Sequence, residues 1–346
     1  MSSIERVQAA IELRPPDRVP VDLHNFQVAA YATGLPMDQV FQSGEMLAQA
    51  MLDAWREYRH DMILLENGTA CNAQACGVKV IYREDAAPAA HIPVLERIQD
   101  VDQLEVPDPN TTFPMCEIIR ATRILVDEIG DQVWICARAD QGPMDLASQL
   151  YAMDDLLIEM AMGDKDEYIF KLLDYSRRVA TRYALALMET GAHSTSIGEP
   201  VAGPDVISPK MYRKYAWRFE KQMVDDLKQH GILLHNHICG NTVPILEDFI
   251  ATGAQVLEID HKTDARKIKA AAAGRTCLLG NIDTALLAAG TPGEVEAACR
   301  ETIEICKPGS GFILGPGCAM GSTTPADNIH ALVEAAKKYG YSSERR

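Results

Sequence analysis

Short apolar runs recur along this chain, and longer stretches with helical periodicity separate them. Each run has the length of one β-strand, and most of the stretches between runs are long enough for a crossover helix. This alternation predicts parallel strands that are joined through right-handed connections. The eight predicted strands are residues 18–23, 61–66, 133–138, 193–198, 232–238, 255–260, 276–280 and 311–315.

The clearest helical pattern covers residues 211–230, where apolar side chains recur at spacings of three and four. Ser208 followed by Pro209 is typical of the start of a helix, with a capping hydroxyl and then proline at the first helical position. Further helices are predicted over residues 243–250, 292–306 and 326–339.

Eight strand–helix units predict an α/β fold, namely a single (β/α)8 TIM-type barrel domain that spans residues 1–346. An open doubly wound sheet is the alternative, because a strand count from sequence alone does not establish closure. A short hairpin around residues 78–82 and a proline-rich loop near Pro107 are predicted to be small insertions in the N-terminal part.

Composition and charge exclude several classes of protein. Apolar residues make up 47% of the chain, but no run approaches the roughly 20 residues of a membrane helix. The first 20 residues lack the apolar block of a signal peptide, so we expect a cytoplasmic protein. A formal net charge of −16 disfavours nucleic-acid binding, because such a surface repels phosphates. The nine cysteines are an odd number in a long chain, which predicts reduced thiols.

Ionisable and polar side chains gather at the predicted carboxyl ends of the strands, where β/α barrels place their active sites. The opposite ends carry far fewer, and this asymmetry favours an enzyme over a non-catalytic binding protein. The residues at the carboxyl ends are Asp22, His24, Glu66, Asn67, Arg138, Asp140, Glu199, His237, Cys239, Glu258, Asp260, Asn281, Asp283 and, in the last loop, Cys318.

The sharpest feature is the pair His237 and Cys239. Residues two apart on a strand face the same side, about 6 to 7 Å apart, so both side chains can reach one ion. Zinc accepts imidazole and thiolate ligands, and Cys318 and Glu258 are the candidates that complete its shell. Three or four ligands, one of them displaceable, predict a catalytic zinc; the paired Cys-x-x-Cys pattern of structural zinc is absent from the sequence.

Other motifs have simpler explanations. The glycines at 315, 317 and 321 resemble a phosphate-binding loop, but Pro316 removes one amide donor, and close approach of the backbone to the metal explains them better. Cys71 and Cys76 are expected to pack in the interior. His24, His193 and His235 are expected to be core or supporting histidines, whereas Asp22, Glu66 and Glu199 either line the pocket or form salt bridges.

Several segments are similar to those of one known family. They are ERVQAAIELRPPDRVPVD (residues 5–22), ISPKMYRKYAWRFEKQMVDDLKQHG (207–231), HNHICGNT (235–242), LLGNID (278–283) and GFILGPGCAMGSTTPADNIHALVEAAKKYG (311–340). Over nearly its whole length the chain resembles the uroporphyrinogen decarboxylase superfamily, in particular its branch of corrinoid-dependent methyltransferases acting on coenzyme M.

The resemblance implies that His237, Cys239 and Cys318 bind zinc. It also implies methyl transfer between a corrinoid and a zinc-activated small substrate. That substrate is either a thiol such as coenzyme M or a methyl donor such as a phenyl methyl ether, as in an O-demethylase. We expect the corrinoid on a separate protein that docks over the carboxyl ends of the strands. Glu199, Glu258 and Asp260 are the candidates for the acid, base or fourth-ligand role, and Asn241, Asn281 and Asp283 are the candidates for cofactor binding.

Two departures separate the chain from the decarboxylases of this superfamily. Their arginine-rich loop after the first strand corresponds here to residues 22–26, which contain no arginine. Their catalytic aspartate, in a Phe-Ser-Asp motif after the second strand, corresponds to Glu66-Asn67-Gly68. Both departures disfavour decarboxylation. The alternative functions are a metal-free decarboxylase and, second, a non-catalytic zinc or corrinoid-protein binding module.

Overall fold

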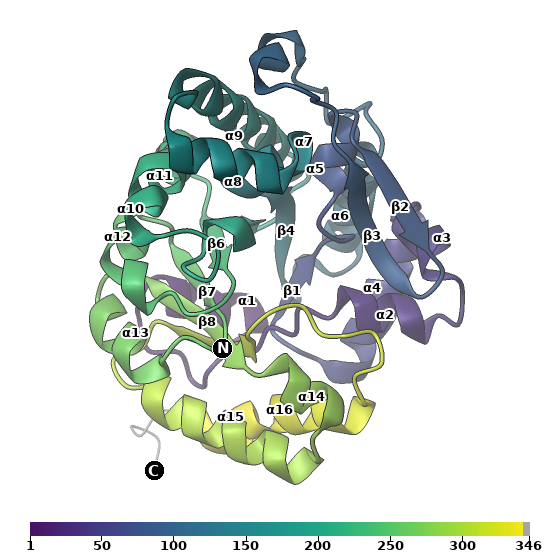
Figure 1. Cartoon of the computed structure of the whole chain (residues 1–346). Coiled ribbons are helices and arrows are strands. Elements are labelled where there is room, and N and C mark those ends of the chain that lie inside the picture. The colour runs from purple at the N-terminus through teal and green to yellow at the C-terminus, as the bar shows by residue number, and fades with distance from the viewer. Residues whose placement is uncertain (342–346) are drawn as a thin grey trace.

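The computed structural model describes residues 1–341, and its centre is one curled sheet of seven parallel strands (Figure 1). The spatial order follows the order along the chain, β1-β4-β5-β6-β7-β8-β9, so each strand lies next to its predecessor. The strands are β1 (Met62–Leu65), β4 (Trp134–Gln141), β5 (Ser194–Gly198), β6 (Leu234–Ile238), β7 (Val256–Ile259), β8 (Cys277–Ile282) and β9 (Phe312–Pro316). Seven of the eight predicted strands are therefore confirmed.

The first predicted strand, residues 18–23, is not a strand of this sheet. Val21 forms an isolated parallel bridge with Leu314 on β9, and Asp22 forms another with Met62 on β1. Pro20 has no N–H to donate, so a longer ladder cannot form on that side of the segment. The sheet has seven strands rather than eight, yet both of its edges contact this one segment, which does not fit an open doubly wound sheet.

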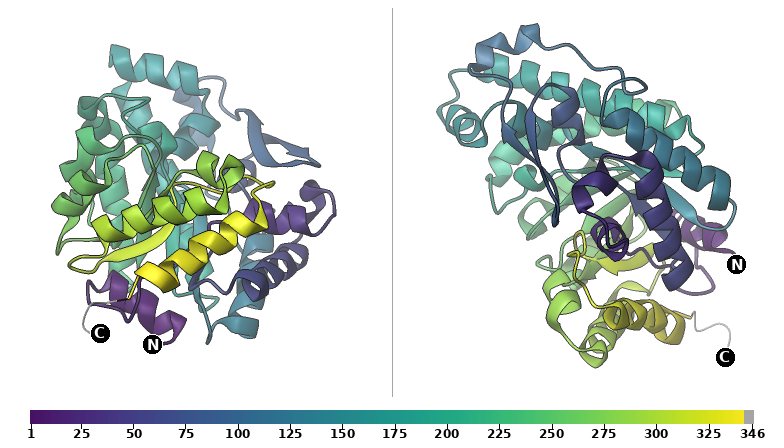
Figure 2. Two further views of the ribbon diagram at one scale, coloured as in Figure 1. Left: turned by 90° about the horizontal axis from the view of Figure 1, so that it is seen from below. Right: turned by 90° about the vertical axis from the view of Figure 1, so that its right-hand side faces the viewer.

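Helices cover the outside of the sheet, and an antiparallel hairpin projects from it after β1 (Figure 2). The hairpin, β2 (Lys79–Arg83) with β3 (Ala86–Ile92), confirms the predicted insertion. The helices are α1 (Ser3–Ile11), α2 (Phe26–Ala32), α3 (Met37–Phe41), α4 (Gly44–Tyr58), α5 (Cys71–Ala75), η1 (Ile98–Gln103), α6 (Met115–Ile129), α7 (Pro143–Leu150), α8 (Met153–Met162), α9 (Asp166–Met188), η2 (Pro200–Ala202), α10 (Pro209–Met211), η3 (Tyr212–Trp217), α11 (Arg218–Gln229), η4 (Val243–Ile245), α12 (Leu246–Ala251), α13 (Ala265–Ala272), α14 (Thr284–Ala289), α15 (Pro292–Cys306) and α16 (Ala326–Tyr339).

The predicted helices form with small changes. Residues 292–306 and 326–339 are α15 and α16, and residues 243–250 fall within η4 and α12. The long helix predicted over 211–230 is interrupted, because Tyr212–Trp217 forms a π-helical segment between α10 and α11. The Ser208 hydroxyl accepts a hydrogen bond from the Met211 amide at 3.3 Å, as its capping position predicts. Among residues 1–341, no helix is long and apolar enough to cross a membrane.

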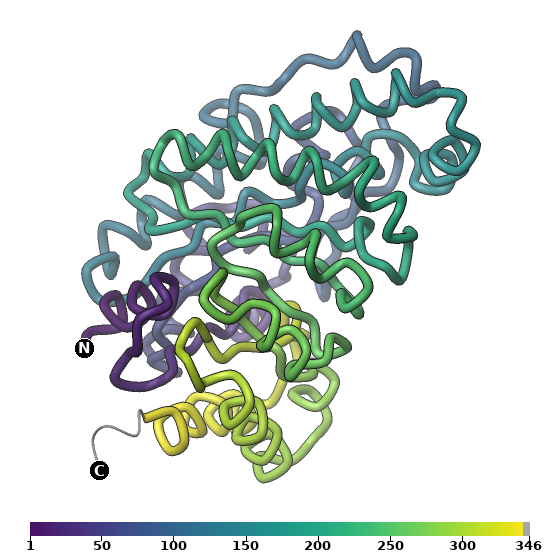
Figure 3. The backbone as a smooth tube through the Cα atoms, turned by 90° about the vertical axis from the view of Figure 1, so that its left-hand side faces the viewer, coloured from purple at the N-terminus to yellow at the C-terminus, as the bar shows by residue number. Residues whose placement is uncertain are grey.

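A buried ion-pair cluster joins the N-terminal segment to the sheet (Figure 3 shows this segment beside α16). Asp61 is 1% exposed and accepts hydrogen bonds from Arg6 and Arg18, each at 2.7 Å, and from the Val21 amide at 3.0 Å. It therefore holds α1 and the bridging segment at the amino end of β1.

We predict that Asp61→Asn lowers the free energy of unfolding by about 3 kcal/mol, because it takes from Arg18 its carboxylate partner and leaves Arg6 with Asp17 alone. Urea unfolding followed by circular dichroism measures this change. The matched control is Asp225→Asn, which removes an exposed partner of Lys221 and should change stability little. Equal, small effects of both variants would show that the Asp61 cluster does not secure the fold.

A second buried carboxyl group lies between β6 and α11. Glu220 on α11 is fully buried, and its Oε2 accepts hydrogen bonds from the Tyr212 hydroxyl at 2.8 Å and the Asn236 amide at 3.2 Å. Burial raises the pKa of Glu220 to about 7, although both hydrogen bonds oppose this rise. The π-helical segment places Tyr212 on this carboxyl group.

This raised pKa predicts a pH-dependent loss of stability. The unfolded chain ionises Glu220 near pH 4.5 and the folded chain near pH 7, so the folded state binds the extra proton between these values. The contribution is therefore present at low pH and lost as pH rises through about 7. Glu220→Gln keeps an acceptor oxygen, and its melting temperature should fall less between pH 5 and pH 8 than that of wild type. The exposed variant Glu301→Gln should behave as wild type, and identical slopes for all three proteins would contradict this account.

Candidate metal centre

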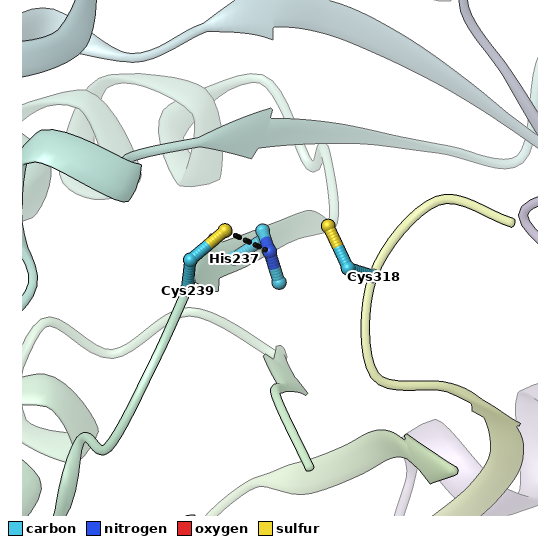
Figure 4. A group of neighbouring side chains, drawn as sticks. All are labelled: His237, Cys239 and Cys318. Carbon is cyan, nitrogen blue, oxygen red and sulfur yellow. Dashed lines mark hydrogen bonds between the residues drawn. The ribbon is translucent and has the colours of Figure 1, made fainter. Parts of the chain in front are cut away.

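One imidazole and two thiols converge at the carboxyl end of the sheet (Figure 4). His237 is on β6, Cys239 follows that strand directly, and Cys318 lies in the loop after β9. One nitrogen and two sulfur atoms from these residues all lie within 4.8 Å of one another, and this is the one such group with three or more potential ligands in the described chain. We call these three residues the metal triad.

The backbone of the sheet orients His237. Its Nδ1 lies 3.1 Å from the carbonyl oxygen of Glu258, with which it pairs in the β6–β7 register. A carbonyl can only accept, so Nδ1 carries the proton and Nε2 keeps its lone pair for a metal. Nε2 lies 3.1 Å from the Cys239 sulfur, on the side where the triad converges.

Two glycines allow the loops of the triad to approach their neighbours. Gly240 has a φ of +82°, and a Cβ there would lie 2.3 Å from a carboxylate oxygen of Asp205. Gly317 precedes Cys318, and a Cβ there would lie 2.6 Å from the amide nitrogen of His261. Of the three glycines predicted to allow close backbone approach in the last loop, Gly317 does so toward His261, whereas a Cβ at Gly321 would meet no atom within 4 Å.

The sulfur atoms of the two cysteines lie within 4.8 Å of one another. The neighbouring Cys239 lowers the pKa of Cys318, and His237 lowers it further against the effect of burial. The neighbouring Cys318 raises the pKa of Cys239 above its usual range. The surroundings of Cys318 thus favour its thiolate form, which is the form that binds metals.

Glu258 does not belong to this group, although the sequence suggests it as a fourth ligand. Its carboxylate is 3.1 Å from Arg138 Nη1 and accepts a 2.5 Å hydrogen bond from the Ser196 hydroxyl. Burial would raise the pKa of Glu258, but Arg138 and three neighbouring histidines lower it. Glu258 is thus an ionised partner of Arg138, and its main-chain oxygen is what orients His237.

Arg138 is the centre of a polar network inside the sheet. It is 4% exposed, and its Nε lies 2.8 Å from Glu66, whose other oxygen is 3.1 Å from His24 Nε2. Burial would lower the pKa of His24, but Glu66 raises it. The sequence places Arg138, Glu66 and His24 at strand ends, but it does not reveal that one guanidinium joins them. Ser196 is absent from that analysis, and its inward position on β5 is the signal that could have identified it.

The carboxyl groups of Asp260 and Glu199 accept hydrogen bonds from backbone amides. Asp260 accepts hydrogen bonds from the amides of Gly240 at 2.8 Å and Lys262 at 2.9 Å, so it shapes the loop that carries Cys239. Glu199 is fully buried and accepts from the amides of Met144 and Asp145 at the start of α7. Burial raises the pKa of Glu199 well above its usual value, and nearby Glu220 and Asp145 add to the rise.

The three residues suggested for cofactor binding lie at the carboxyl ends of β6 and β8: Asn241 and Asp283 in the loops after these strands, and Asn281 near the end of β8. Asn241 is exposed, and its side chain accepts from the Val243 amide at 3.1 Å. Asn281 donates to the Thr263 carbonyl at 3.1 Å, and Asp283 caps α14 through the Ala285 amide. Each has a local structural partner, and Asn241 and Asp283 also face solvent.

Comparison with known proteins places the chain in a family. The model of the uroporphyrinogen decarboxylase (URO-D) family matches residues 2–339. The chain is 29% identical to the methylcobamide:CoM methyltransferase MtbA of Methanosarcina mazei over 97% of its length and 98% of that protein. It is 27% identical to MtaA of Methanosarcina barkeri, and 23% identical to a uroporphyrinogen decarboxylase of Magnetococcus marinus over 98% of both chains.

A solved structure shares the fold. A methyltransferase from Methanosarcina mazei superimposes with a TM-score of 0.89 at 24% identity, over 98% of this chain and 99% of that one. The resemblance predicted from the sequence, including the similarity to the methyltransferase branch, is thereby confirmed. The chain belongs to the uroporphyrinogen decarboxylase family.

Proposed function

We propose that this chain is a zinc-dependent methyltransferase that moves a methyl group between a corrinoid and a small substrate. The observation that carries the proposal is the metal triad, His237, Cys239 and Cys318, at the carboxyl end of the sheet. Of the named relatives with near-complete coverage, the methylcobamide:CoM methyltransferases, at 29% and 27% identity, are more similar to the chain than the decarboxylase at 23%, and this supports methyl transfer. We also infer that the segment around Val21 completes a barrel around the site by joining both edge strands.

The donor set of the triad fits zinc. Two thiolate sulfurs and one neutral imidazole nitrogen are ligands that zinc binds in a tetrahedral shell. Three protein ligands leave one position for a substrate, as in catalytic rather than structural zinc sites. When bound there, zinc would act as a Lewis acid that lowers the pKa of a coordinated thiol or improves an ether oxygen as a leaving group.

The protein's own residues would prepare this site. The Glu258 carbonyl fixes the tautomer of His237, and Arg138 holds the Glu258 side chain away from the metal group. We propose Asp260, at the loop of Cys239, as the acid or base that exchanges the substrate proton. Glu199 is fully buried, so we assign it a positioning role at α7.

Methyl transfer to a thiol requires a corrinoid as the second substrate. The sulfur electron pair forms the new S–CH3 bond, the Co–CH3 bond breaks with its pair left on cobalt, and the thiol proton leaves to a base. In the other direction, demethylation of a phenyl methyl ether, the electron pair of Co(I) would form the Co–CH3 bond. The O–CH3 bond would break with its pair left on the phenolate oxygen, which then takes a proton. We propose that a separate corrinoid protein docks over the carboxyl ends of β6 and β8, where Asn241, Asn281 and Asp283 lie.

The alternative of a metal-free decarboxylase has less support. Residues 22–26 offer no arginine to a polycarboxylate substrate, and Asp22, Leu23 and Phe26 are buried. Glu66, at the position of the decarboxylase aspartate motif, is held by Arg138 and His24. A non-catalytic binding module would not need the ligand position that a zinc ion held by three protein residues would leave for a substrate.

We predict about one zinc per chain when the protein is purified without chelators, measured by elemental analysis. Cys239→Ala and Cys318→Ala should each lose most of this zinc, because each removes a thiolate ligand. Cys116→Ala, a half-buried cysteine on α6 outside the triad, is the control and should keep it. Wild-type protein that stays zinc-free after incubation with the metal would refute the site.

We predict that the zinc-loaded protein transfers methyl groups from methylcobalamin to a small thiol, followed by the change in corrinoid absorbance. Cys239→Ala should reduce this rate by at least about 100-fold, because an interaction made in the transition state is lost. The reverse assay, from an aryl methyl ether to reduced corrinoid, establishes the direction. Activity that persists in fully zinc-free protein would contradict the metal mechanism.

A further inference from the structure

Carboxylates dominate the loops that directly follow the strands around the metal triad. In residues 23–25 and in these loops, Lys262 is the single lysine or arginine within the described chain. The same loops carry six carboxyl groups, which are Glu66, Glu199, Asp205, Asp260, Asp264 and Asp283. Burial raises the pKa of Glu199 and disfavours its charged form, so the other five supply the negative charge. A substrate bound at the triad would therefore extend into a region with excess negative charge.

Lys262 does not neutralise this excess of negative charge at the triad. Its side chain is 58% exposed, and its Nζ lies 3.6 Å from Asp205, which is also exposed. An exposed lysine that already faces a carboxylate and is screened by solvent adds little attraction for an anion at the buried triad.

Arg138, the cation inside the sheet, is also unavailable. Glu66 and Glu258 lie 2.8 Å and 3.1 Å from its nitrogens, so two carboxylates share one guanidinium. Its remaining nitrogen, Nη2, packs against Gly198, where an added Cβ would lie only 2.4 Å away. The guanidinium is thus enclosed by its partners and by the backbone of β5.

A hollow beside the loop after β5 also lacks lysine and arginine among its described lining residues. This hollow of about 470 Å³ lies between the β2–β3 hairpin, α7 and η2, beside the loop that begins at Glu199. Asp145, Ser148 and Gln149 are among its polar lining residues, and no lysine or arginine of the described chain lines it. A negatively charged substrate group placed there would lose water without gaining an ion pair.

We propose that this site takes a thiol whose non-reacting end is neutral or positively charged, and that it discriminates against an anionic end. The inference rests on the proposed function and specifies its substrate class. It sets the chain apart from relatives named for coenzyme M, 2-mercaptoethanesulfonate, whose sulfonate would have no cation to pair with among the charged groups described above.

Three thiols of equal length test the proposal: 2-mercaptoethanesulfonate, 2-mercaptoethanol and 2-aminoethanethiol. Their binding to the zinc-loaded full chain is measured by calorimetry and expressed per thiolate, so that differences in thiol acidity cancel. We expect the neutral and cationic thiols to bind at least about tenfold more tightly than the sulfonate. A sulfonate that binds equally or more tightly, or the failure of all three to bind, would overturn the proposal.

Glu66→Gln tests the origin of the preference. It removes one of the two carboxylates on Arg138 at nearly constant size, so the affinity for the sulfonate should rise about tenfold relative to the neutral thiol. Glu304→Gln, an exposed carboxylate on α15, changes the net charge equally and should leave the ratio unchanged. Equal ratios in both variants would count against the assigned electrostatic cause, and the wild-type series decides the preference even if Glu66→Gln fails to fold.

The two levels of the proposal fail in different ways. A neutral preference in binding without methyl transfer from methylcobalamin would leave this inference intact and refute the proposed function. Methyl transfer that is fastest with the sulfonate would support the proposed function and refute this inference.

Discussion

The Arg138 guanidinium, held between two carboxylates inside the sheet, is the interaction on which the site depends. It connects β4 with Glu66 after β1 and with Glu258 on β7, and it also contacts Ser196 on β5. A buried charge persists only when its partners are present and well aligned, so these strands are fixed relative to one another. The Glu258 carboxylate pairs with Arg138, so it is not part of the metal triad. The main-chain carbonyl of Glu258 orients His237.

Much of this architecture could be predicted from local pattern. The apolar runs located the seven strands to within a few residues, because buried parallel strands read as short continuous apolar segments. The segment at residues 18–23 has the same pattern but forms only two bridges to the sheet, since Pro20 lacks a donor and the residues that follow leave the extended conformation at His24, whose φ is +43°. The apolar spacing likewise did not reveal the π-helical segment at Tyr212–Trp217, because Tyr212, Tyr215 and Phe219 recur at spacings of three and four and are all buried across it.

The candidate site, too, could be predicted from the sequence only in part. His237 and Cys239 could be paired from their spacing, since a strand brings alternate residues to one face. Cys318 is 79 positions further along the chain than Cys239, and its place after the last predicted strand and the family resemblance were the two signals that linked them. Glu258 was suggested as a ligand because its predicted strand lies next to that of His237. The sequence did not show that Arg138, on the non-adjacent strand β4, forms an ion pair with the Glu258 carboxylate. Non-local charge pairing is the information that a single sequence does not display.

Within one family, the same sheet can support different chemistry because the groups that recognise the substrate lie in loops rather than in strands. Here the strands supply the imidazole, the orienting carbonyl and the enclosed arginine, all of which are buried. The loops after them supply both cysteines and a surplus of carboxylates. Two cysteinate charges would balance a divalent zinc ion, so zinc itself would bring no net positive charge to hold an anionic substrate. The charge of the surrounding loops would then decide which substrate can approach, and in this chain those loops are acidic.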